Sequence, residues 1–149
     1  MIIRIDNKKA SFAQAIRDIF QASYAVEAAL LQAIDFPPLK RTITDFLNSD
    51  TIFYAYYIEN TIGGIIEVRH TQESTHIQSL VVYPKYFRKG IGRKLVQFVL
   101  QTHMSLLFTV ETGADNYPAI QLYKRLGFEQ DSEFDTDHGI KKVSFKKAG

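Results

Sequence analysis

The chain has 149 residues, of which 46% are hydrophobic and 23% are charged, and its formal net charge is +2. This length suits a single domain over residues 1–149, the apolar share suffices for a packed core, and the small charge argues against nucleic-acid binding. Cysteine is absent, which excludes a thiol nucleophile, disulfides and thiolate metal sites and fits a reducing, cytoplasmic location.

The N-terminal third predicts a strand and two helical segments. Residues 1–6 have the pattern of a first strand rather than a signal peptide, and no apolar run in the chain approaches the ~20 residues of a membrane span. Ser11 and Gln14 form a predicted capping box at the start of the first helical segment. Helical spacing of apolar residues continues over 24–34, and a second stripe covers 39–49.

The middle of the chain predicts three strands joined by turns. Residues 52–58 are rich in aromatic side chains, and residues 62–69 and 76–83 continue the strand pattern. The polar segments 59–61 and 72–74 turn the chain back between them.

The third of these strands runs into a basic, glycine-containing turn that opens an amphipathic helix. Gly90 and Gly92 let a ligand approach the backbone because neither carries a Cβ. The first N–H groups of a helix have no intrahelical partner, and the helix dipole adds positive potential there. Basic side chains surround the turn: Arg88, Lys89, Arg93 and Lys94. The pattern predicts a pyrophosphate site at the helix start; a turn that merely joins a strand to a helix is the alternative.

Two other phosphate-binding motifs do not fit this turn. A Walker loop needs Gly-Lys-Ser/Thr, but Arg93 and Lys94 follow Gly92. A dinucleotide fingerprint needs a third glycine where Leu95 stands.

The last part of the chain predicts a strand, a helix and a closing hairpin. Residues 106–111 read as a buried strand. Asn116 is a predicted N-cap, and Gly127 suits the position just after the helix. Residues 128–134 and 140–145 predict the hairpin, which gives the order β-α-α-β-β-β-α-β-α-β-β.

Two segments of this sequence resemble motifs of the GCN5-related N-acetyltransferase (GNAT) family. Leu80, Val82 and Pro84 match its Leu-x-Val-x-Pro strand, and the following turn is similar to the Gln/Arg-x-x-Gly-x-Gly/Ala turn that binds the pyrophosphate of acetyl-CoA. Residues 116–128 resemble motif B, Asn-x-x-Ala-x-x-Leu-Tyr-x-x-x-Gly-Phe, at every named position.

The sequence departs from motif A at two positions. Phe87 stands at the family's Gln/Arg position, and Arg88 stands where a glycine is common. Because the family uses mostly backbone amides at this turn, Phe87 still offers its N–H, and Arg88 is a candidate for the displaced charge. The departure bears on cofactor affinity more than on cofactor identity.

The resemblance implies an α/β fold of the GNAT acyl-CoA N-acyltransferase type. Its central mixed sheet would have roughly six to seven strands, flanked by about four helices and splayed between two central parallel strands. The implied activity is an acetyl-CoA-dependent N-acetyltransferase that moves an acetyl group to a primary amine by direct attack in a ternary complex. Acetyl-CoA is the expected cosubstrate, and no metal is expected.

The resemblance also implies a set of cofactor-binding residues. The backbone of residues 80–82 would face the pantetheine arm, the glycine turn would hold the pyrophosphate, and the motif B asparagine would contact the cofactor. The expected set is Leu80, Val81, Val82, Phe87, Arg88, Lys89, Gly90, Ile91, Gly92, Arg93, Asn116, Ala119 and Tyr123.

Two residues are candidates for catalysis. Tyr123 matches the motif B tyrosine that often lies beside the CoA sulfur, so it is the candidate acid; packing in the core is the alternative. Glu111 has the spacing of the catalytic glutamate in the ribosomal-protein alanine acetyltransferases, so it is the candidate base, acting through water. Glu67 and His76 are its rivals.

The acceptor amine is expected between the first two helices and the last hairpin, as in the family, and is either a small molecule or a peptide. Residues expected there include Tyr24, Glu27, Phe36, Pro37, Pro38, Leu39 and residues 135–138, and the carboxylates that could attract a cationic amine are Glu27, Asp35, Asp135 and Asp137. A non-catalytic acyl-CoA-binding or sensing module and a nucleic-acid-binding domain remain alternatives. A homodimer is one expected assembly, and no membrane partner is expected.

Overall fold

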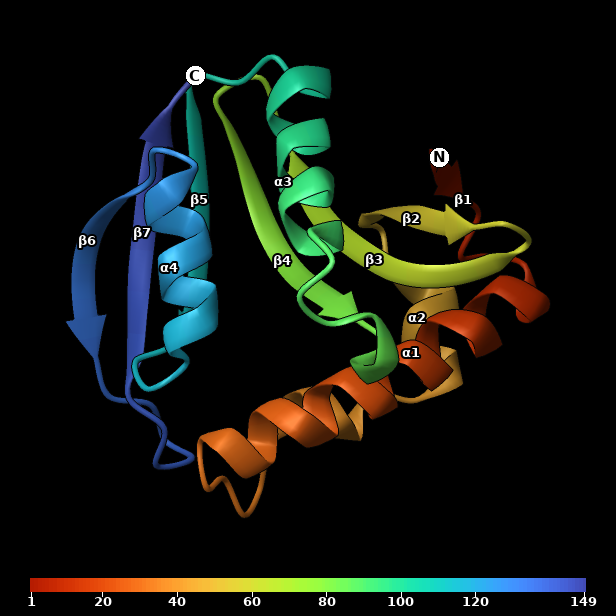
Figure 1. Cartoon of the computed structure of the whole chain (residues 1–149), viewed down its shortest axis with the longest axis horizontal. Coiled ribbons are helices and arrows are strands. Elements are labelled where there is room, and N and C mark those ends of the chain that lie inside the picture. Colours follow the sequence, from red (N-terminus) through yellow and green to blue (C-terminus); the bar gives the residue numbers. More distant parts are fainter.

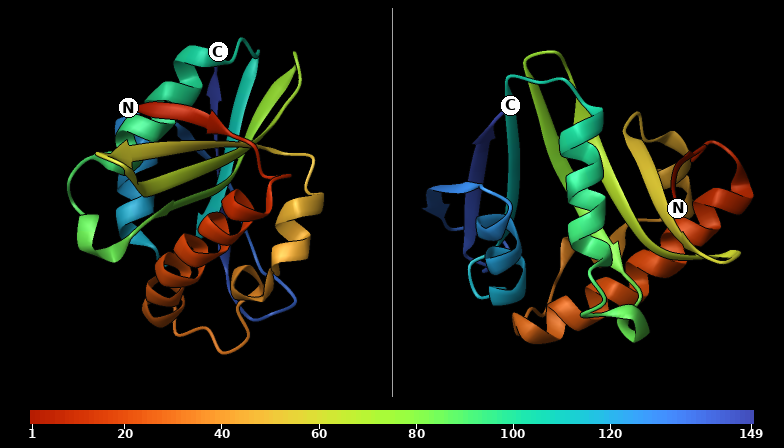
Figure 2. Two further views of the ribbon diagram at one scale, coloured as in Figure 1. Left: turned by 90° about the vertical axis from the view of Figure 1, so that its right-hand side faces the viewer. Right: turned by 45° about the horizontal axis from the view of Figure 1, so that its top comes forward.

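A computed structural model describes all residues, 1–149, and contains a seven-stranded sheet with helices on both faces (Figures 1 and 2). The strands are β1 (Ile2–Ile5), β2 (Ile52–Ile58), β3 (Thr61–His70), β4 (Ser74–Val82), β5 (Leu107–Gly113), β6 (Glu129–Phe134) and β7 (Lys142–Ala148). The α-helices are α1 (Ala10–Leu30), α2 (Ile43–Asn48), α3 (Ile91–Thr102) and α4 (Tyr117–Arg125). The predicted order of strands and helices is therefore confirmed. None of these helices combines the length and apolar character needed to cross a membrane.

The sheet has the strand order β1-β2-β3-β4-β5-β7-β6. Its first four strands form an antiparallel meander, and β7 pairs antiparallel with both β5 and β6. Only β4 and β5 are parallel, and α3 makes the crossover connection that such a pair requires. This is the expected mixed sheet with two central parallel strands.

The two parallel strands pair over only part of their length. Ser74–Ile77 of β4 lie beside Leu107–Val110 of β5, and the pairing stops there. Beyond this point β4 continues to Val82 and β5 to Gly113, and the strands diverge toward α1 (Figure 1). The splay expected from the resemblance is therefore present, and it leaves backbone N–H and C=O groups of both strands facing a gap.

Each face of the sheet has its own apolar core. The buried stripe of α1, which includes Ile16, Ile19 and Phe20, packs with α2 on residues of β2, β3 and β4. The opposite face carries α3 and α4, and Leu95 and Val99 belong to a core that extends to β5 and β7. Figure 2 shows the two helix layers on opposite sides of the sheet. The gap between β4 and β5 therefore lies between two helix layers.

The predicted capping box at the start of the first helix is wrong. Helix α1 begins at Ala10, and its N-cap is Lys9, which makes no side-chain capping hydrogen bond. The Lys9 N–H donates instead to the Asp6 carbonyl oxygen at 3.1 Å. This tight turn starts the helix early and leaves Ser11 and Gln14 inside it, where they have no free helix end to cap.

The connection after α1 also differs from the prediction. The helix ends at Leu30 rather than at Ile34, and Gln32 adopts a left-handed φ of 54° that no α-helix continues through. A capping box that was not predicted starts α2. Thr42 Oγ1 accepts from the Asp45 N–H at 3.1 Å, and Asp45 Oδ2 accepts from the Thr42 N–H at 2.8 Å.

The predicted ends of α4 are confirmed. Asn116 is its N-cap, and its side chain accepts a hydrogen bond from the Ala119 N–H at 3.3 Å. Gly127 follows the helix with a φ of 92°, a left-handed conformation that favours glycine. These two ends fix where α4 starts beside the gap and which of its faces meets the sheet.

Candidate active site

A cleft with a volume of 1120 Å³ occupies the gap between β4 and β5. Its walls come from α1 and the segment after it, the splayed ends of β4 and β5, the start of α3, and α4. Because α1 covers one face of the sheet and α3 and α4 cover the other, the cleft passes through the sheet. Both helix layers therefore contribute walls to the same space between the strands.

The turn between β4 and α3 has an open, left-handed backbone. Arg88 and Gly90 have φ values of 64° and 78°, and α3 starts without a side-chain cap on Gly90. A Cβ at Gly90 would meet no atom within 4 Å. A Cβ at Gly92 would contact Leu80 and Leu122 at 3.6 and 3.7 Å. The first N–H groups of α3 therefore lack a capping side chain, as an anion site requires.

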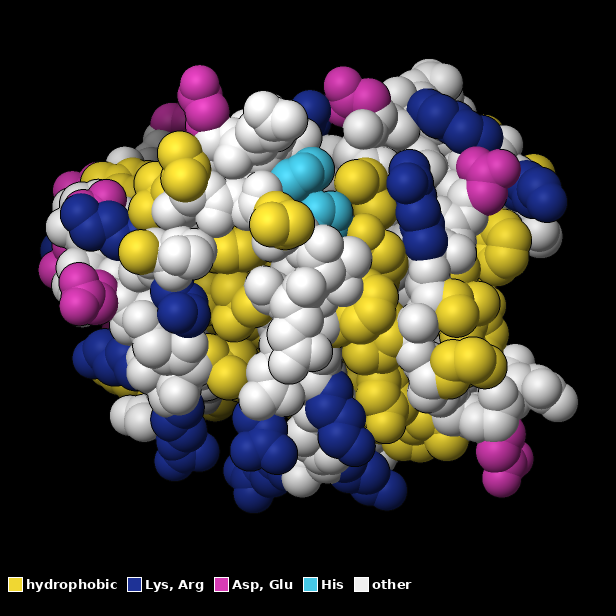
Figure 3. All heavy atoms as spheres, turned by 90° about the horizontal axis from the view of Figure 1, so that it is seen from above, with side chains coloured by type: hydrophobic (Ala, Val, Ile, Leu, Met, Phe, Trp, Pro, Cys, Tyr) yellow, Lys and Arg dark blue, Asp and Glu magenta, His cyan; other side chains and the backbone are white.

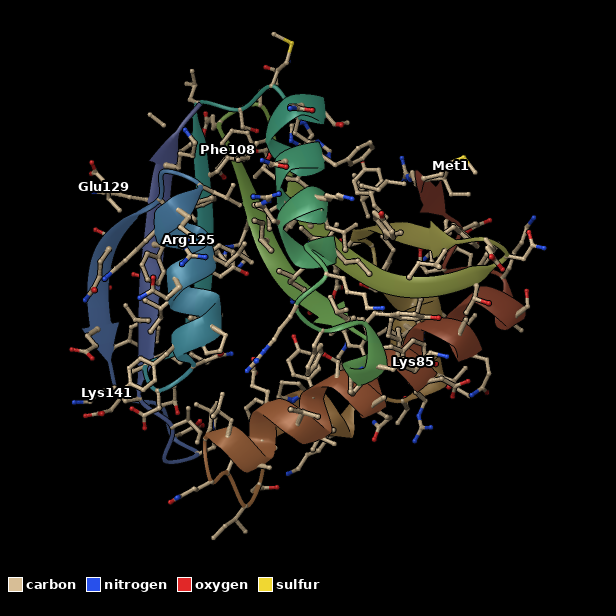
Figure 4. All side chains as sticks on the ribbon, viewed as in Figure 1. Met1, Lys85, Phe108, Arg125, Glu129 and Lys141 are labelled. Atoms are coloured by element: carbon tan, nitrogen blue, oxygen red, sulfur yellow. The ribbon has the colours of Figure 1, made fainter.

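Basic side chains lie on this side of the cleft. Arg88 and Arg93 line it at the start of α3, and Arg125, which Figure 4 labels on α4, lines it from across the gap. Figure 3 shows Lys and Arg side chains gathered along the lower edge of the molecule as seen from above. These charges favour an anionic ligand at the α3 end of the cleft.

Most of the expected cofactor residues line this one cleft. They are Leu80, Val82, Phe87, Arg88, Gly90, Ile91, Gly92, Arg93, Asn116, Ala119 and Tyr123. Val81 does not, because its side chain is buried in the core under α1. Lys89 is also outside the lining, and its Nζ lies 5.8 Å from the centre of the Tyr86 ring.

The backbone of β4 offers a hydrogen-bond donor to the gap. The Tyr83 N–H donates to the Gly63 carbonyl of β3 at 3.0 Å, whereas the Val82 N–H donates to Ser23 Oγ of α1 at 3.3 Å. Successive residues of a strand direct their N–H groups to opposite sides, so residues two positions apart share a side. The Leu80 N–H therefore points away from β3, as that of Val82 does, and faces the gap.

Tyr123 is a buried residue of α4 with its hydroxyl on the cleft. Its side chain is 3% exposed, and its ring packs against Phe128 and Phe145. No protein group hydrogen-bonds the hydroxyl, which remains accessible from the cleft. Burial raises the pKa of this phenol strongly, and Tyr24 and Glu27 raise it further. The hydroxyl therefore keeps its proton at neutral pH.

Glu27 reaches the same part of the cleft from α1. Its carboxylate Oε1 accepts a hydrogen bond from Asn116 Nδ2 at 2.6 Å, so one asparagine both caps α4 and holds this carboxylate. Burial raises the pKa of Glu27, against opposing effects of the Asn116 hydrogen bond and the Lys142 charge. From the sequence, Glu27 was expected to attract a cationic amine and had no predicted part in the chemistry.

Glu111, the predicted base, also lines the cleft. Its side chain is 41% exposed, and its carboxylate lies 3.9 Å from the Lys142 ammonium. The two rival candidates for the base, Glu67 and His76, lie elsewhere. Neither Glu67 nor His76 lines the cleft, and His76 Nδ1 is 2.8 Å from Thr109 Oγ1.

Glu67 is sequestered by a buried hydrogen-bond network. Its carboxylate is fully buried and accepts from the two terminal guanidinium nitrogens of Arg41, Nη1 and Nη2, at 2.7 and 3.1 Å. Thr51 Oγ1 and Ser79 Oγ donate to the same carboxylate at 2.6 and 3.0 Å. These four donors leave it no access to a substrate proton.

The wall of the cleft under α1 is largely aromatic and apolar. Five residues that were expected to contact the acceptor line this wall: Tyr24, Phe36, Pro37, Pro38 and His138. The carboxylates of Asp35, Asp135 and Asp137 do not line it, and Asp35 pairs with Lys40. Several polar lining residues were not predicted as site residues: Arg41, Gln97, Gln121, Arg125 and Lys142. Gln97 was predictable from its spacing, since it follows Gly90 and Arg93 on one face of α3.

Comparisons with known proteins point to one family. A model of the acetyltransferase (GNAT) family matches residues 13–128. The UPF0157 protein YqkA of Bacillus subtilis is 31% identical over 131 residues, which are 87% of this chain and 38% of that protein. Streptothricin acetyltransferase of Escherichia coli is 25% identical over 119 residues, which are 76% of this chain and 68% of that protein. The chain therefore spans well under half the length of the first of these relatives.

A solved structure shows the same fold. The PaiA N-acetyltransferase of Thermoplasma acidophilum, in complex with coenzyme A, superimposes with a TM-score of 0.77 at 17% identity. The superposition covers 100% of this chain and 99% of that one.

Proposed function

The chain belongs to the GNAT family of acetyltransferases, and from this membership we propose that it transfers an acetyl group from acetyl-CoA to a primary amine. One observation carries the proposal. The uncapped start of α3, the Leu80 N–H and the Tyr123 hydroxyl all face one cleft that passes through the sheet. An anion site, an oxyanion donor and a proton donor are the groups that acetyl transfer from a thioester requires.

The cofactor occupies the α3 and α4 side of the cleft in this proposal. Its pyrophosphate lies at the start of α3, against the N–H groups that follow Gly90 and the guanidinium groups of Arg88 and Arg93. Its pantetheine arm extends along the unpaired end of β4 toward Tyr123. Asn116 and Ala119 form the α4 wall, so Asn116 would serve the cofactor as well as the helix.

The reaction is a direct attack in a ternary complex. An alkyl ammonium must lose a proton before its nitrogen can attack the thioester carbonyl. The Leu80 N–H then donates to the oxyanion of the tetrahedral intermediate. The walls that both helix layers give to one cleft support this mechanism, because there is a side for the amine and a side for acetyl-CoA, and no acyl-enzyme step is needed.

Tyr123 would assist departure of the thiolate. A free thiol has a pKa of about 8.5, below that of a buried phenol, so Tyr123 cannot simply surrender its proton to the sulfur. It donates a hydrogen bond as negative charge develops, and it passes its proton on only while it receives one from the attacking nitrogen. The buried, protonated phenol suits this relay.

A thiol-release screen tests the proposal. The chain is incubated with acetyl-CoA and representatives of five amine classes: aminoglycosides, polyamines, amino acids, peptide N-termini and lysine side chains. The expected result is amine-dependent release of CoA with a product heavier by one acetyl group. Binding of acetyl-CoA without turnover of any class would favour the non-catalytic acyl-CoA-binding module instead.

A further inference from the structure

The lining of the cleft contains two carboxylates, and they differ in their partners. Glu111 lies beside the Lys142 ammonium at 3.9 Å and is 41% exposed. Glu27 has no cationic group within 4.0 Å, and its one hydrogen-bond donor is the neutral amide of Asn116 at 2.6 Å. An acidic side chain in a partly buried wall is costly unless a cation completes it. The ammonium group of an amine substrate would be such a cation, closer to Glu27 than the Lys142 charge that already acts on it.

The surroundings of Glu27 keep its carboxylate in one place. It lies on the face of α1 that also carries Tyr24, and Asn116 fixes it from α4 across the splayed strands. The titratable groups that act on it or feel its charge are Tyr24, Tyr123 and Lys142. Two phenols from opposite sides of the gap therefore share the electrostatic environment of this carboxylate.

We propose that Glu27, positioned by Asn116, binds the ammonium group of the acceptor and removes its proton. This inference rests on the proposed acetyl transfer and assigns the base within it. A carboxyl group whose burial raises its pKa toward neutrality is a better base than an exposed one, which supports the assignment.

The protons balance along this route. The ammonium R–NH3+ gives its first proton to the Glu27 carboxylate, and the nitrogen then forms a bond with the thioester carbonyl carbon. As the C–S bond breaks, the electron pair leaves with sulfur, and a second nitrogen proton reaches the sulfur through Tyr123. Glu27 later releases its proton to solvent, so the products are the amide, the CoA thiol and one proton.

The same site disfavours an acceptor that carries a carboxylate next to its amine. The cations in the lining on this side are Arg41, which is engaged by buried Glu67, and Lys142, which lies beside Glu111. No unpaired Lys or Arg is left there to receive an anionic substituent. The aromatic wall of Tyr24 and Phe36 suits an apolar body. The acceptor class is therefore a primary amine with an apolar or aromatic body and no neighbouring carboxylate.

Tyramine and tyrosine form a matched pair of probes, since they differ only in the carboxylate. For the wild-type chain, we expect kcat/KM for tyramine to exceed that for tyrosine at least tenfold. Equal rates with the two probes, or turnover of neither, would overturn the substrate class.

The base is tested with Glu27→Gln, which keeps an oxygen for the Asn116 hydrogen bond and removes the charge. Two matched changes accompany it: Glu111→Gln in the same cleft, and Glu133→Gln on the exposed strand β6 outside the cleft. We expect Glu27→Gln to lower kcat/KM for tyramine at pH 7 roughly 100- to 1,000-fold. Its acetyl-CoA affinity, measured by calorimetry, should stay within about twofold of wild type, because the residue is on the acceptor side.

The pH profile separates a base from a merely structural carboxylate. The wild-type kcat/KM should fall on the acid side as Glu27 protonates and level off at higher pH. In Glu27→Gln only the free amine reacts, so the rate should rise about tenfold per pH unit up to the pKa of the amine. Asn116→Ser keeps a capping oxygen but loses the donor to Glu27, and it should move the acid limb to higher pH.

Three results would overturn the assignment. An unchanged pH profile in Glu27→Gln is the first. Loss of the acid limb in Glu111→Gln instead would return the role of base to Glu111. The third is failure of the wild-type chain to bind acetyl-CoA, which would refute the proposed function together with this inference. If the wild type and the variants bind acetyl-CoA normally, the first two results would refute the assignment of Glu27 alone.

Discussion

Replacing Arg88 by glycine should leave the fold as stable as before or stabilise it, while it weakens acetyl-CoA binding. Arg88 has a φ of 64°, in the left-handed region that costs a non-glycine residue roughly 1–2 kcal/mol. Glycine removes this cost but adds about 0.4–1 kcal/mol of backbone freedom to the unfolded chain. The net change in the free energy of unfolding is therefore about 0–1.5 kcal/mol in favour of the variant. For a chain of this length that is a rise in Tm of up to about 5 °C.

The effect on binding has the opposite sign. The Arg88 side chain is exposed, so the phosphate contact that we propose for it would be screened by water and worth about 1 kcal/mol. Its loss should raise the Kd for acetyl-CoA about fivefold. Arg88→Ala is the matched control, because it removes the same charge and keeps the left-handed strain. It should bind as weakly as Arg88→Gly and melt at a lower temperature.

Two assays separate these effects: thermal denaturation of the three proteins and calorimetric titration with acetyl-CoA at two salt concentrations. The reasoning would be refuted if Arg88→Gly were less stable than Arg88→Ala, because the strain would then be absent. It would also be refuted if both variants bound acetyl-CoA as the wild type does, because the guanidinium would then have no part in the phosphate site.

The remaining predictions concern the helix start, the proton relay and a buried ion pair. Gly90→Val should raise the Kd for acetyl-CoA more than tenfold in calorimetry, because its side chain would project into the space at the start of α3; Gly139→Val, at a similar φ of 82° outside the cleft, should not. Tyr123→Phe should lower kcat about 100-fold in the thiol-release assay with acetyl-CoA affinity nearly intact, and wild-type turnover would leave Tyr123 a packing role. Arg41→Met should lower the free energy of unfolding by roughly 3–5 kcal/mol in denaturant titrations, because its carboxylate partner is fully buried. Arg69→Met breaks an exposed pair and should cost less than about 1 kcal/mol; equal losses would contradict the burial argument.

Local patterns explain how much of the fold was predictable. The ends of α4 follow from Asn116 and Gly127, whose effects reach only a few residues along the chain. The capping box at Ser11 failed for a reason of the same short range, because the turn at Asp6 starts the helix first. Competition between two adjacent local signals is decided by a small free-energy difference that a residue pattern does not report.

The candidate site was less predictable where it depends on contacts between distant segments. Glu67 looked like a rival base because nothing near it in the sequence indicates that Arg41, Thr51 and Ser79 converge on its carboxylate. The backbone of residues 80–82 was expected to face the cofactor as one segment, and alternation along the strand turns the Val81 side chain into the α1 core while Leu80 and Val82 line the cleft.

Glu27 did leave a signal in the sequence. It continues the buried stripe of α1 that contains Ile16, Phe20 and Tyr24, at helical spacings of three and four residues. A lone carboxylate on an apolar helix face requires a partner. That partner, Asn116, lies 89 positions away, which is why the pair became visible only in the folded chain.

The most direct measurement is a calorimetric titration of the wild-type chain with acetyl-CoA. The account predicts saturable binding of one cofactor per chain with micromolar affinity, weakened by the Gly90→Val substitution at the start of α3. No binding at millimolar acetyl-CoA would contradict it, because the cleft between β4 and β5 would then have no cofactor to present to an amine.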